Sequence, residues 1–130
     1  MRDFNDLLVW ERSHRLTLAL YRATDHFPKS EMFGLVSQIR RAGASIPTNL
    51  AEGCGRWGDG DMGRFLQIAM GSASELDYLM RLAKDLDYFQ ACEYQQLGEE
   101  LGEIRRMLTG FYKRVRRPVE RQTVSRNAKS

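Results

Sequence analysis

The residues most able to do chemistry form a basic segment at the C-terminal end of the chain. Residues 101–130 hold nine Lys and Arg against two Asp and Glu, whereas residues 1–100 hold eleven against fifteen. Guanidinium and ammonium groups bind phosphates, so this excess favours a polyanionic partner, either nucleic acid or an acidic protein face. The candidate nucleic-acid-binding residues are Arg105, Arg106, Lys113, Arg114, Arg116 and Arg117. Tyr112 is the aromatic residue placed to stack on a base, and no motif with defined groove geometry accompanies it.

A second polar set lies near Pro47 and consists of Arg41, Ser45, Asn49, Glu52 and Arg56. Their spacing of four, four, three and four residues places them on one face of a helix. Ser and Asn are costly in a merely solvated helix interior, so they either satisfy backbone groups freed by Pro47 or bond to another subunit. Ligand contact and plain solvation are the alternatives. The candidate oligomer-interface residues of this set are Arg41, Ser45, Asn49 and Glu52.

Signatures of catalysis, metal binding and cofactor binding are weak. His14 and His26 are twelve residues apart, which is about 18 Å along one helix and too far to share an ion. Gly53, Gly55 and Gly58 match the dinucleotide-binding pattern GxGxxG, but a helical pattern precedes them instead of a strand. We therefore expect no catalytic residues, no metal and no cofactor, and an enzyme is the least favoured class.

These residues must be positioned by helices, because helical periodicity covers nearly the whole chain and strand signals are missing. The pattern predicts helices over about residues 5–25, 30–54, 59–86 and 91–116. Short connections favour antiparallel neighbours, so the expected fold class is all-α, an antiparallel up-down-up-down four-helix bundle. The apolar seam of the second helix keeps its phase across Pro47. This favours one helix kinked at Pro47 over two helices, the second capped by Ser45.

The first helix carries two apolar stripes about 160° apart at 100° per residue. One contains Leu7, Trp10, His14, Leu18 and Tyr21, and the other contains Val9, Leu16 and Leu20. One surface of a small bundle covers only one of them. We therefore expect Val9, Leu16 and Leu20 to lie at a contact between subunits, with a tightly wrapped monomer core as the alternative.

Composition limits the class of protein further. Apolar residues make up 42% and charged residues 28% of the 130 residues, ordinary values for a globular domain. No apolar run approaches the roughly 18 residues that cross a bilayer, and the start does not resemble a signal peptide. We expect a cytoplasmic bundle domain over residues 1–117, followed by a disordered basic tail over 118–130. Cys54 and Cys92 are expected to be reduced packing thiols.

A longer motif surrounds Pro47 and carries a resemblance to a known family. It reads Glu31-x-x-Gly34-Leu35-x-x-Gln38-x-Arg40-Arg41-Ala42, then Ser45-Ile46-Pro47-x-Asn49-x-Ala51-Glu52-Gly53. Further matches are Leu7-x-Val9-Trp10, Phe65-Leu66-x-Ile68-Ala69-x-Gly71-Ser72-x-x-Glu75-Leu76 and Met107-Leu108. Together they resemble, over about residues 4–112, the four-helix bundle family of proteins encoded in intervening sequences of bacterial 23S ribosomal RNA genes.

The resemblance implies a homopentameric ring, which would use the second stripe of the first helix and the polar set near Pro47. The family is also distantly similar to the accessory protein of diversity-generating retroelements, a basic pentamer thought to bind nucleic acid and a reverse transcriptase. We expect a non-catalytic, homo-oligomeric accessory factor with modest, sequence-independent binding of RNA or DNA through the basic C-terminal segment. The alternative is a scaffold whose ring presents repeated faces to a protein partner. No membrane partner is expected.

Overall fold

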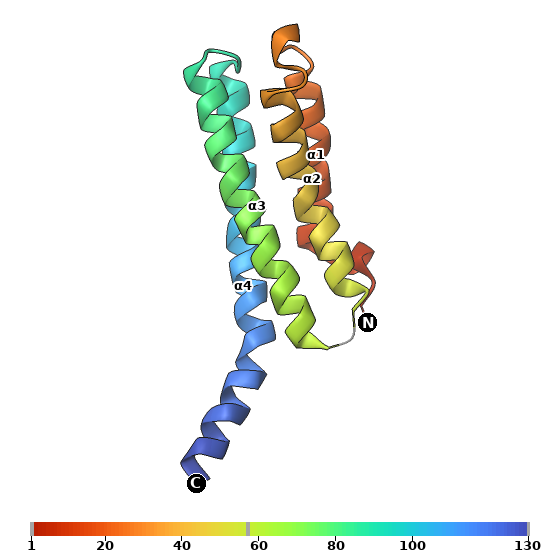
Figure 1. Ribbon diagram of the computed structural model, residues 1–130, viewed down its shortest axis with the longest axis vertical. Coiled ribbons are helices and arrows are strands. Elements are labelled where there is room, and N and C mark those ends of the chain that lie inside the picture. Colours follow the sequence, from red (N-terminus) through yellow and green to blue (C-terminus); the bar gives the residue numbers. More distant parts are fainter. Residues whose placement is uncertain (1, 57, 130) are drawn as a thin grey trace.

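The computed structural model describes residues 2–56 and 58–129, with the side chains of residues 59 and 117–129 left out of the description. Its elements are the short 3₁₀ helices η1 (Phe4–Asp6) and η2 (Lys29–Glu31) and the α-helices α1 (Leu8–Thr24), α2 (Leu35–Cys54), α3 (Asp59–Asp85) and α4 (Ala91–Lys129). The described ranges contain no strand. The predicted class, an all-α bundle of four helices, is confirmed (Figure 1).

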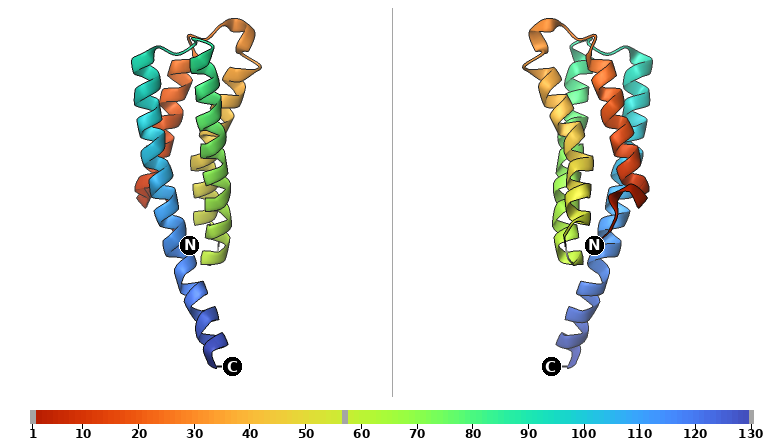
Figure 2. Two further views of the ribbon diagram at one scale, coloured as in Figure 1. Left: turned by 90° about the vertical axis from the view of Figure 1, so that its left-hand side faces the viewer. Right: turned by 90° about the vertical axis from the view of Figure 1, so that its right-hand side faces the viewer.

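Each α-helix packs against the next one in the chain, and α1 also packs against α4, which closes the bundle. The α1–α2 and α3–α4 connections lie together at one end (Figure 1). The N-terminus and the α2–α3 connection lie at the opposite end, here called the lower end. The two side views show α4 continuing past the lower end of the bundle (Figure 2).

The first helix begins later than the sequence predicted, because a separate turn precedes it. Asp3 accepts a hydrogen bond from the backbone N–H of Asn5 at 2.9 Å and so caps η1. Leu7 is in an extended conformation, and α1 starts only at Leu8. In the same way η2 and Gly34 precede α2, whose first residue is Leu35.

The assignment of Val9, Leu16 and Leu20 to a contact between subunits is wrong. These side chains are 5%, 2% and 0% exposed and belong to the core of the single chain. The reason is geometric: α1 packs against both α2 and α4, so the face between those two helices is covered without a second copy. The other stripe is the open one, and there Leu18 and Tyr21 are 41% and 46% exposed.

The second helix runs without a break through Pro47, so the alternative of two helices is wrong. A proline has no backbone N–H, so it cannot bond to the carbonyl oxygen of Gly43 one turn earlier. The Thr17 hydroxyl of α1 shares its one hydrogen between that oxygen, at 3.2 Å, and the Ser13 carbonyl oxygen, at 2.8 Å. The missing bond of α2 is therefore replaced by one that joins α2 to α1.

Close packing accompanies this bond. A Cβ atom on Gly43 would lie 2.6 Å from the Leu20 Cδ1 atom, which makes glycine the residue that fits here. The apolar seam predicted for α2 is buried from Val36 through Ile39 and Ile46 to Leu50. The interior of α2 is thus fixed against α1 by a hydrogen bond and by the fit between side chains.

The polar set near Pro47 is used in part within the chain. The Ser45 and Ser72 hydroxyls are 2.7 Å apart and join α2 to α3. The Asn49 amide donates to the Ser45 carbonyl oxygen at 2.8 Å and to its hydroxyl at 3.0 Å. Neither side chain bonds to the Gly43 carbonyl oxygen that Pro47 leaves open. Arg41 and Glu52 are exposed, and their role at an oligomer interface stays a prediction.

The last helix is longer than predicted, because α4 continues through Pro118 to Lys129. A proline fixes φ near the helical value and removes one hydrogen bond, so it does not have to end a helix. The predicted boundary at residue 117 is therefore not the end of the helical backbone. The seam of α4 is buried as predicted, at Leu97, Leu101, Ile104, Leu108, Phe111 and Val115.

The two cysteines have different environments. Cys54 is buried at the end of α2, and burial raises the pKa of its thiol. Cys92 is exposed near the start of α4 and is not the packing thiol that was expected.

The contact between Thr17 and Gly43 gives a first prediction. Thr17→Val keeps the shape of the side chain but leaves the Gly43 carbonyl oxygen without this donor, so we expect the free energy of unfolding to fall by about 1–3 kcal/mol. Urea denaturation followed by circular dichroism measures it. The matched control is Thr109→Val, because the Thr109 hydroxyl bonds to the Arg105 carbonyl oxygen of its own helix. Equal stability of the two variants would contradict this role of Thr17.

Candidate nucleic-acid interface

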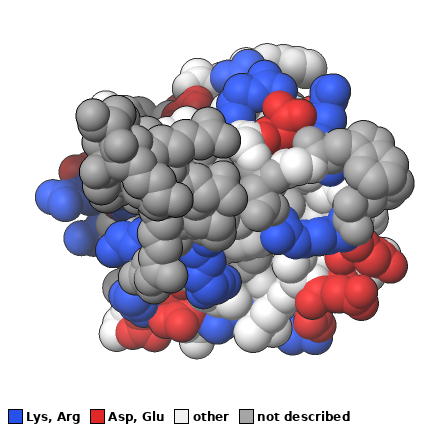
Figure 3. Space-filling view, turned by 90° about the horizontal axis from the view of Figure 1, so that it is seen from below, with Lys and Arg blue, Asp and Glu red and all other residues white. Residues whose placement is uncertain are grey.

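Basic side chains from three separate segments meet at the lower end of the bundle. Arg2 precedes η1, Arg64 lies in the first turns of α3, and Lys113, Arg114 and Arg116 lie on α4. The backbone N–H of Arg2 donates to the Cys54 carbonyl oxygen at 3.0 Å, which fixes the N-terminal segment to the end of α2. Lys and Arg side chains gather at this end together with several Asp and Glu side chains (Figure 3).

One cleft of about 420 Å³ lies between the N-terminal segment and α4, and we call it the Phe111 cleft. Its walls include Arg2, Arg106 and Arg114, and its apolar floor includes Met107 and Phe111. The Arg2 and Arg114 guanidinium carbons lie 5.5 and 5.6 Å from the centre of the Phe111 ring. Such cation–π contacts hold the guanidinium groups beside the ring, and guanidinium is the side-chain group best suited to bidentate contacts with phosphates.

A second cleft of about 320 Å³ lies between α3 and α4, and we call it the Tyr112 cleft. It is lined by Gly60, Gly63, Arg64, Gln67, Tyr112, Val115 and Arg116. The Tyr112 hydroxyl accepts hydrogen bonds from the Gln67 amide at 2.9 Å and from the Arg116 guanidinium at 3.3 Å. These bonds fix the ring between the two helices, with basic groups on both sides.

The six residues predicted to bind nucleic acid do not form one continuous surface. Arg105 lies further up α4, where it bonds to Asp77 at 2.9 Å and to the Ser74 hydroxyl at 3.2 Å. Arg106 is paired with Glu103 at 2.7 Å, although it also lines the Phe111 cleft. Lys113, Arg114 and Arg116 are exposed near the lower end. The side chain of Arg117 lies outside the described residues.

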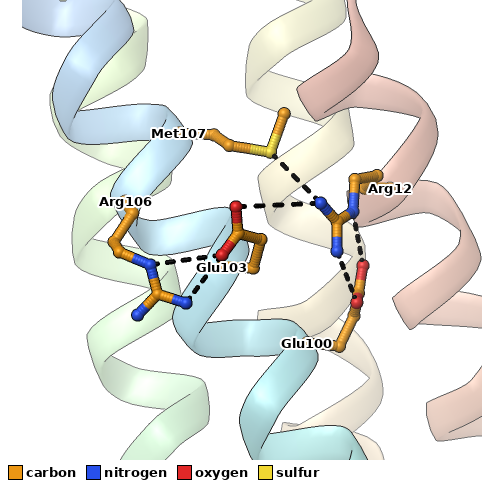
Figure 4. Close-up of polar contacts among 5 residues, drawn as sticks. All are labelled: Arg12, Glu100, Glu103, Arg106 and Met107. Carbon is orange, nitrogen blue, oxygen red and sulfur yellow. Dashed lines mark hydrogen bonds and ion pairs between the residues drawn. The ribbon is translucent and has the colours of Figure 1, made fainter.

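Arg106 also belongs to a network that joins α4 to α1 (Figure 4). Arg12 of α1 binds both carboxylate oxygens of Glu100 at 2.9 and 2.8 Å and lies 3.9 Å from Glu103. The hydrogen bond to Glu100 raises the pKa of Arg12, and the hydrogen bond from Arg106 lowers the pKa of Glu103. The network thus balances basic and acidic charge in the middle of the bundle.

A wider cleft of about 600 Å³ runs along α1 and α4 above this network. Arg15 and Arg22 lie on its α1 wall, with His26 just beyond the end of α1, and Glu93 and Glu100 lie on its α4 wall. A polyanion would meet carboxylates along one wall, so electrostatic complementarity disfavours nucleic acid here.

Neither a metal site nor a membrane-spanning helix is found among the residues that the structure describes. None of their His, Cys, Asp and Glu side chains form a group of three that could hold a metal ion. Within the same ranges, no helix has the length and apolar character needed to cross a membrane.

Sequence reasoning missed Arg2 and Gln67 as parts of the lower surface. Arg2 precedes the first residue of α4, Ala91, by 89 positions, and its place is shown by the bond to the end of α2 and by its contact with the Phe111 ring. Gln67 follows Arg64 by almost one helical turn, a spacing that would have placed both on one face of the third helix.

The fold and the lower surface define a four-helix bundle with a basic end. The model of the 23S rRNA-intervening sequence protein family matches residues 5–110, so the chain belongs to this family, as the sequence motifs indicated. The fold is similar to a crystal structure of a protein of unknown function from the S23 ribosomal protein family of Bacteroides thetaiotaomicron. The TM-score is 0.74 at 24% identity, over 82% of this chain and 99% of that one. A comparison with curated proteins gives no match.

The pKa of Glu103 gives a prediction about stability. Because that pKa is lowered in the folded protein, the charged carboxylate favours folding at neutral pH, and this contribution is lost as the pH falls through the lowered pKa. Glu103→Gln should therefore be less stable than the wild type at neutral pH and should converge with it at the acid end of a pH scan. Thermal unfolding at several pH values measures this. Glu75→Gln on α3 is the control. The prediction would be contradicted if the difference in melting temperature between Glu103→Gln and the wild type were the same at all pH values.

Proposed function

We propose that the protein is a non-catalytic accessory factor that binds nucleic acid, without sequence preference, at the lower end of the bundle. The observation that carries the proposal is the convergence of Arg2, Arg64, Lys113, Arg114 and Arg116 on this end. They come from three segments that the fold brings together. Phosphate contacts supply most of the affinity in binding of this kind, and they carry no sequence information.

The ion pairs agree with this location. Arg12, Arg105 and Arg106 are matched by carboxylates within 4 Å in the middle of the bundle, which makes them less available to a polyanion. At the lower end Arg64 lies 3.7 Å from Asp61. Both partners are about half exposed, so solvent screens this pair and a phosphate can compete for Arg64.

The arrangement proposed for the whole chain is an antiparallel up-down-up-down bundle, bent at Pro47, acting in the cytoplasm. In this orientation the C-terminal part of α4 extends from the basic end (Figure 2). Residues 117–130 contribute four further Arg and Lys against one Glu by sequence, at Arg117, Arg121, Arg126 and Lys129. This charge adds to the attraction for phosphates on the same side of the molecule.

Charge reversal tests the proposal. The double variant Lys113→Glu, Arg114→Glu should lose at least about tenfold in affinity for a labelled oligonucleotide at about 50 mM salt. The control is Arg15→Glu, Arg22→Glu on α1, which changes net charge equally and should bind within about threefold of the wild type. Fluorescence anisotropy measures both, with affinity falling linearly on a logarithmic salt axis. Absence of wild-type binding at low salt, or equal losses in both variants, would exclude this interface.

A second candidate function is that of a homo-oligomeric scaffold, and the exposed face of α1 favours it. Leu18 and Tyr21 are 41% and 46% exposed, and Trp10 is only half-buried, with its ring stacked on that of His14 at 5.1 Å. Apolar and aromatic side chains grouped on one face are typical of a contact between proteins. We infer that this stripe joins copies of the chain, in place of Val9, Leu16 and Leu20, and that the assembly is a pentameric ring.

Light scattering coupled to size exclusion tests the assembly. The wild type should have about five times the single-chain mass of 15.0 kDa. Leu18→Glu, Tyr21→Glu should reduce the mass to that of one chain while keeping helicity, because two charges would be buried at the contact. Ile68→Glu on α3, also 44% exposed, is the control and should leave the mass unchanged. A wild-type mass near 15 kDa at micromolar concentration would exclude the ring.

A further inference from the structure

We propose that the Tyr112 cleft receives one unpaired base, so that the ligand of the lower end is single-stranded nucleic acid. This inference rests on the proposed binding of nucleic acid and adds the class of ligand. Four side chains carry it: Arg64 and Gln67 on α3 and Tyr112 and Arg116 on α4. The glycines Gly60 and Gly63 leave the space in which the base would lie.

The size and shape of the cleft suit a flat ring. Its volume of about 320 Å³ falls at the lower end of the range of about 300–1,000 Å³ typical of small-molecule sites. A Cβ atom on Gly60 would meet nothing within 4 Å, and a Cβ atom on Gly63 would lie 3.8 Å from the Tyr112 Cε2 atom. The missing side chain at Gly63 therefore leaves space beside the Tyr112 ring, and the Arg116 guanidinium carbon lies 5.7 Å from the centre of that ring.

The chemistry of the lining matches a nucleotide. Aromatic rings stack on bases of any sequence, which agrees with binding that lacks sequence preference. The Gln67 amide and the Tyr112 hydroxyl lie 2.9 Å apart and provide polar groups for a base edge. The guanidinium groups of Arg64 and Arg116 line the same cleft and are placed to contact the phosphates on either side of the base.

The position of the clefts favours a single strand over a duplex. Bases in a duplex are stacked inside it and do not enter a cleft between two helices unless they are flipped out, which costs a few kcal/mol. The Phe111 cleft and the Tyr112 cleft contain consecutive aromatic residues of α4, which point to different sides of the helix. A flexible strand that crosses α4 can reach both clefts with its bases and the arginines between them with its phosphates.

Filling the cleft tests the inference without changing charge. Gly63→Leu places an apolar side chain beside the Tyr112 ring. Gly71→Leu on the same helix is the matched control, because a Cβ atom there would meet nothing within 4 Å. Leucine has a higher helix propensity than glycine, so neither change is expected to unfold α3. Tyr112→Leu removes the ring itself, and Tyr78→Leu, at a tyrosine 64% exposed on α3, is its control. Circular dichroism checks the fold of all four variants.

The probes are fluorescein-labelled oligonucleotides of about 12 nucleotides, used in anisotropy measurements at one low salt concentration. They are an oligouridylate, the corresponding DNA oligothymidylate, a blunt duplex of mixed sequence, and an abasic DNA strand of equal length. The RNA and DNA strands share the unpaired base and the phosphates. Comparing them separates these common features from recognition of the ribose hydroxyl, which the inference does not require.

We expect Gly63→Leu and Tyr112→Leu to bind both single strands about 5- to 100-fold more weakly than the wild type. Duplex and abasic strands keep their phosphates but offer no unpaired base, so each should bind the wild type and these two variants equally well. The two control variants should behave as the wild type. If instead both variants bind single strands as tightly as the wild type, the base does not enter this cleft. If the double variant Lys113→Glu, Arg114→Glu nevertheless loses its affinity for the same strands, nucleic acid binds at the lower end without using this cleft. The proposed function would then hold and this inference would be wrong. If the wild type binds none of the probes, both proposals are wrong.

Discussion

The bundle depends on how it replaces the hydrogen bond that Pro47 removes from α2. The Thr17 hydroxyl reaches across from α1 to the Gly43 carbonyl oxygen at 3.2 Å, and Leu20 fills the space that a side chain at position 43 would need. A buried carbonyl oxygen without a donor is costly, so these two helices pack in one register. On the other side of α2, the Ser45 and Ser72 hydroxyls join it to α3.

This register determines what lies at the lower end. The end of α2 holds the N-terminal segment through the bond between the Arg2 N–H and the Cys54 carbonyl oxygen, and Arg2 then lies over Phe111 of α4. Ion pairs such as Arg12 with Glu100 occupy the middle of the bundle. Basic side chains from three segments therefore meet at the lower end, although residues 1–100 carry more acidic than basic side chains.

The helices and their buried seams were predictable, because each seam repeats with the period of a helix and Pro47 does not disturb its phase. The family motif was also recognisable, because its residues follow one another closely in the sequence around Pro47. The sequence could not show which of the two stripes of α1 is buried within the chain and which is exposed. Periodicity shows that a face is apolar but not whether a helix of the same chain covers it. Val9, Leu16 and Leu20 were misassigned for that reason. The clefts were not predictable either, because Arg2, Arg64 and Tyr112 come together only in the folded chain.

Contact of nucleic acid with both faces of α4 at the lower end can be measured by titrating the isotope-labelled protein with an oligouridylate and following the backbone amide chemical shifts. We expect the largest shifts in residues 60–67 and 106–116 and at Arg2, with little change around Leu18 and Tyr21 on α1. Shifts that centre on the exposed stripe of α1, or that spread evenly over the surface, would contradict it.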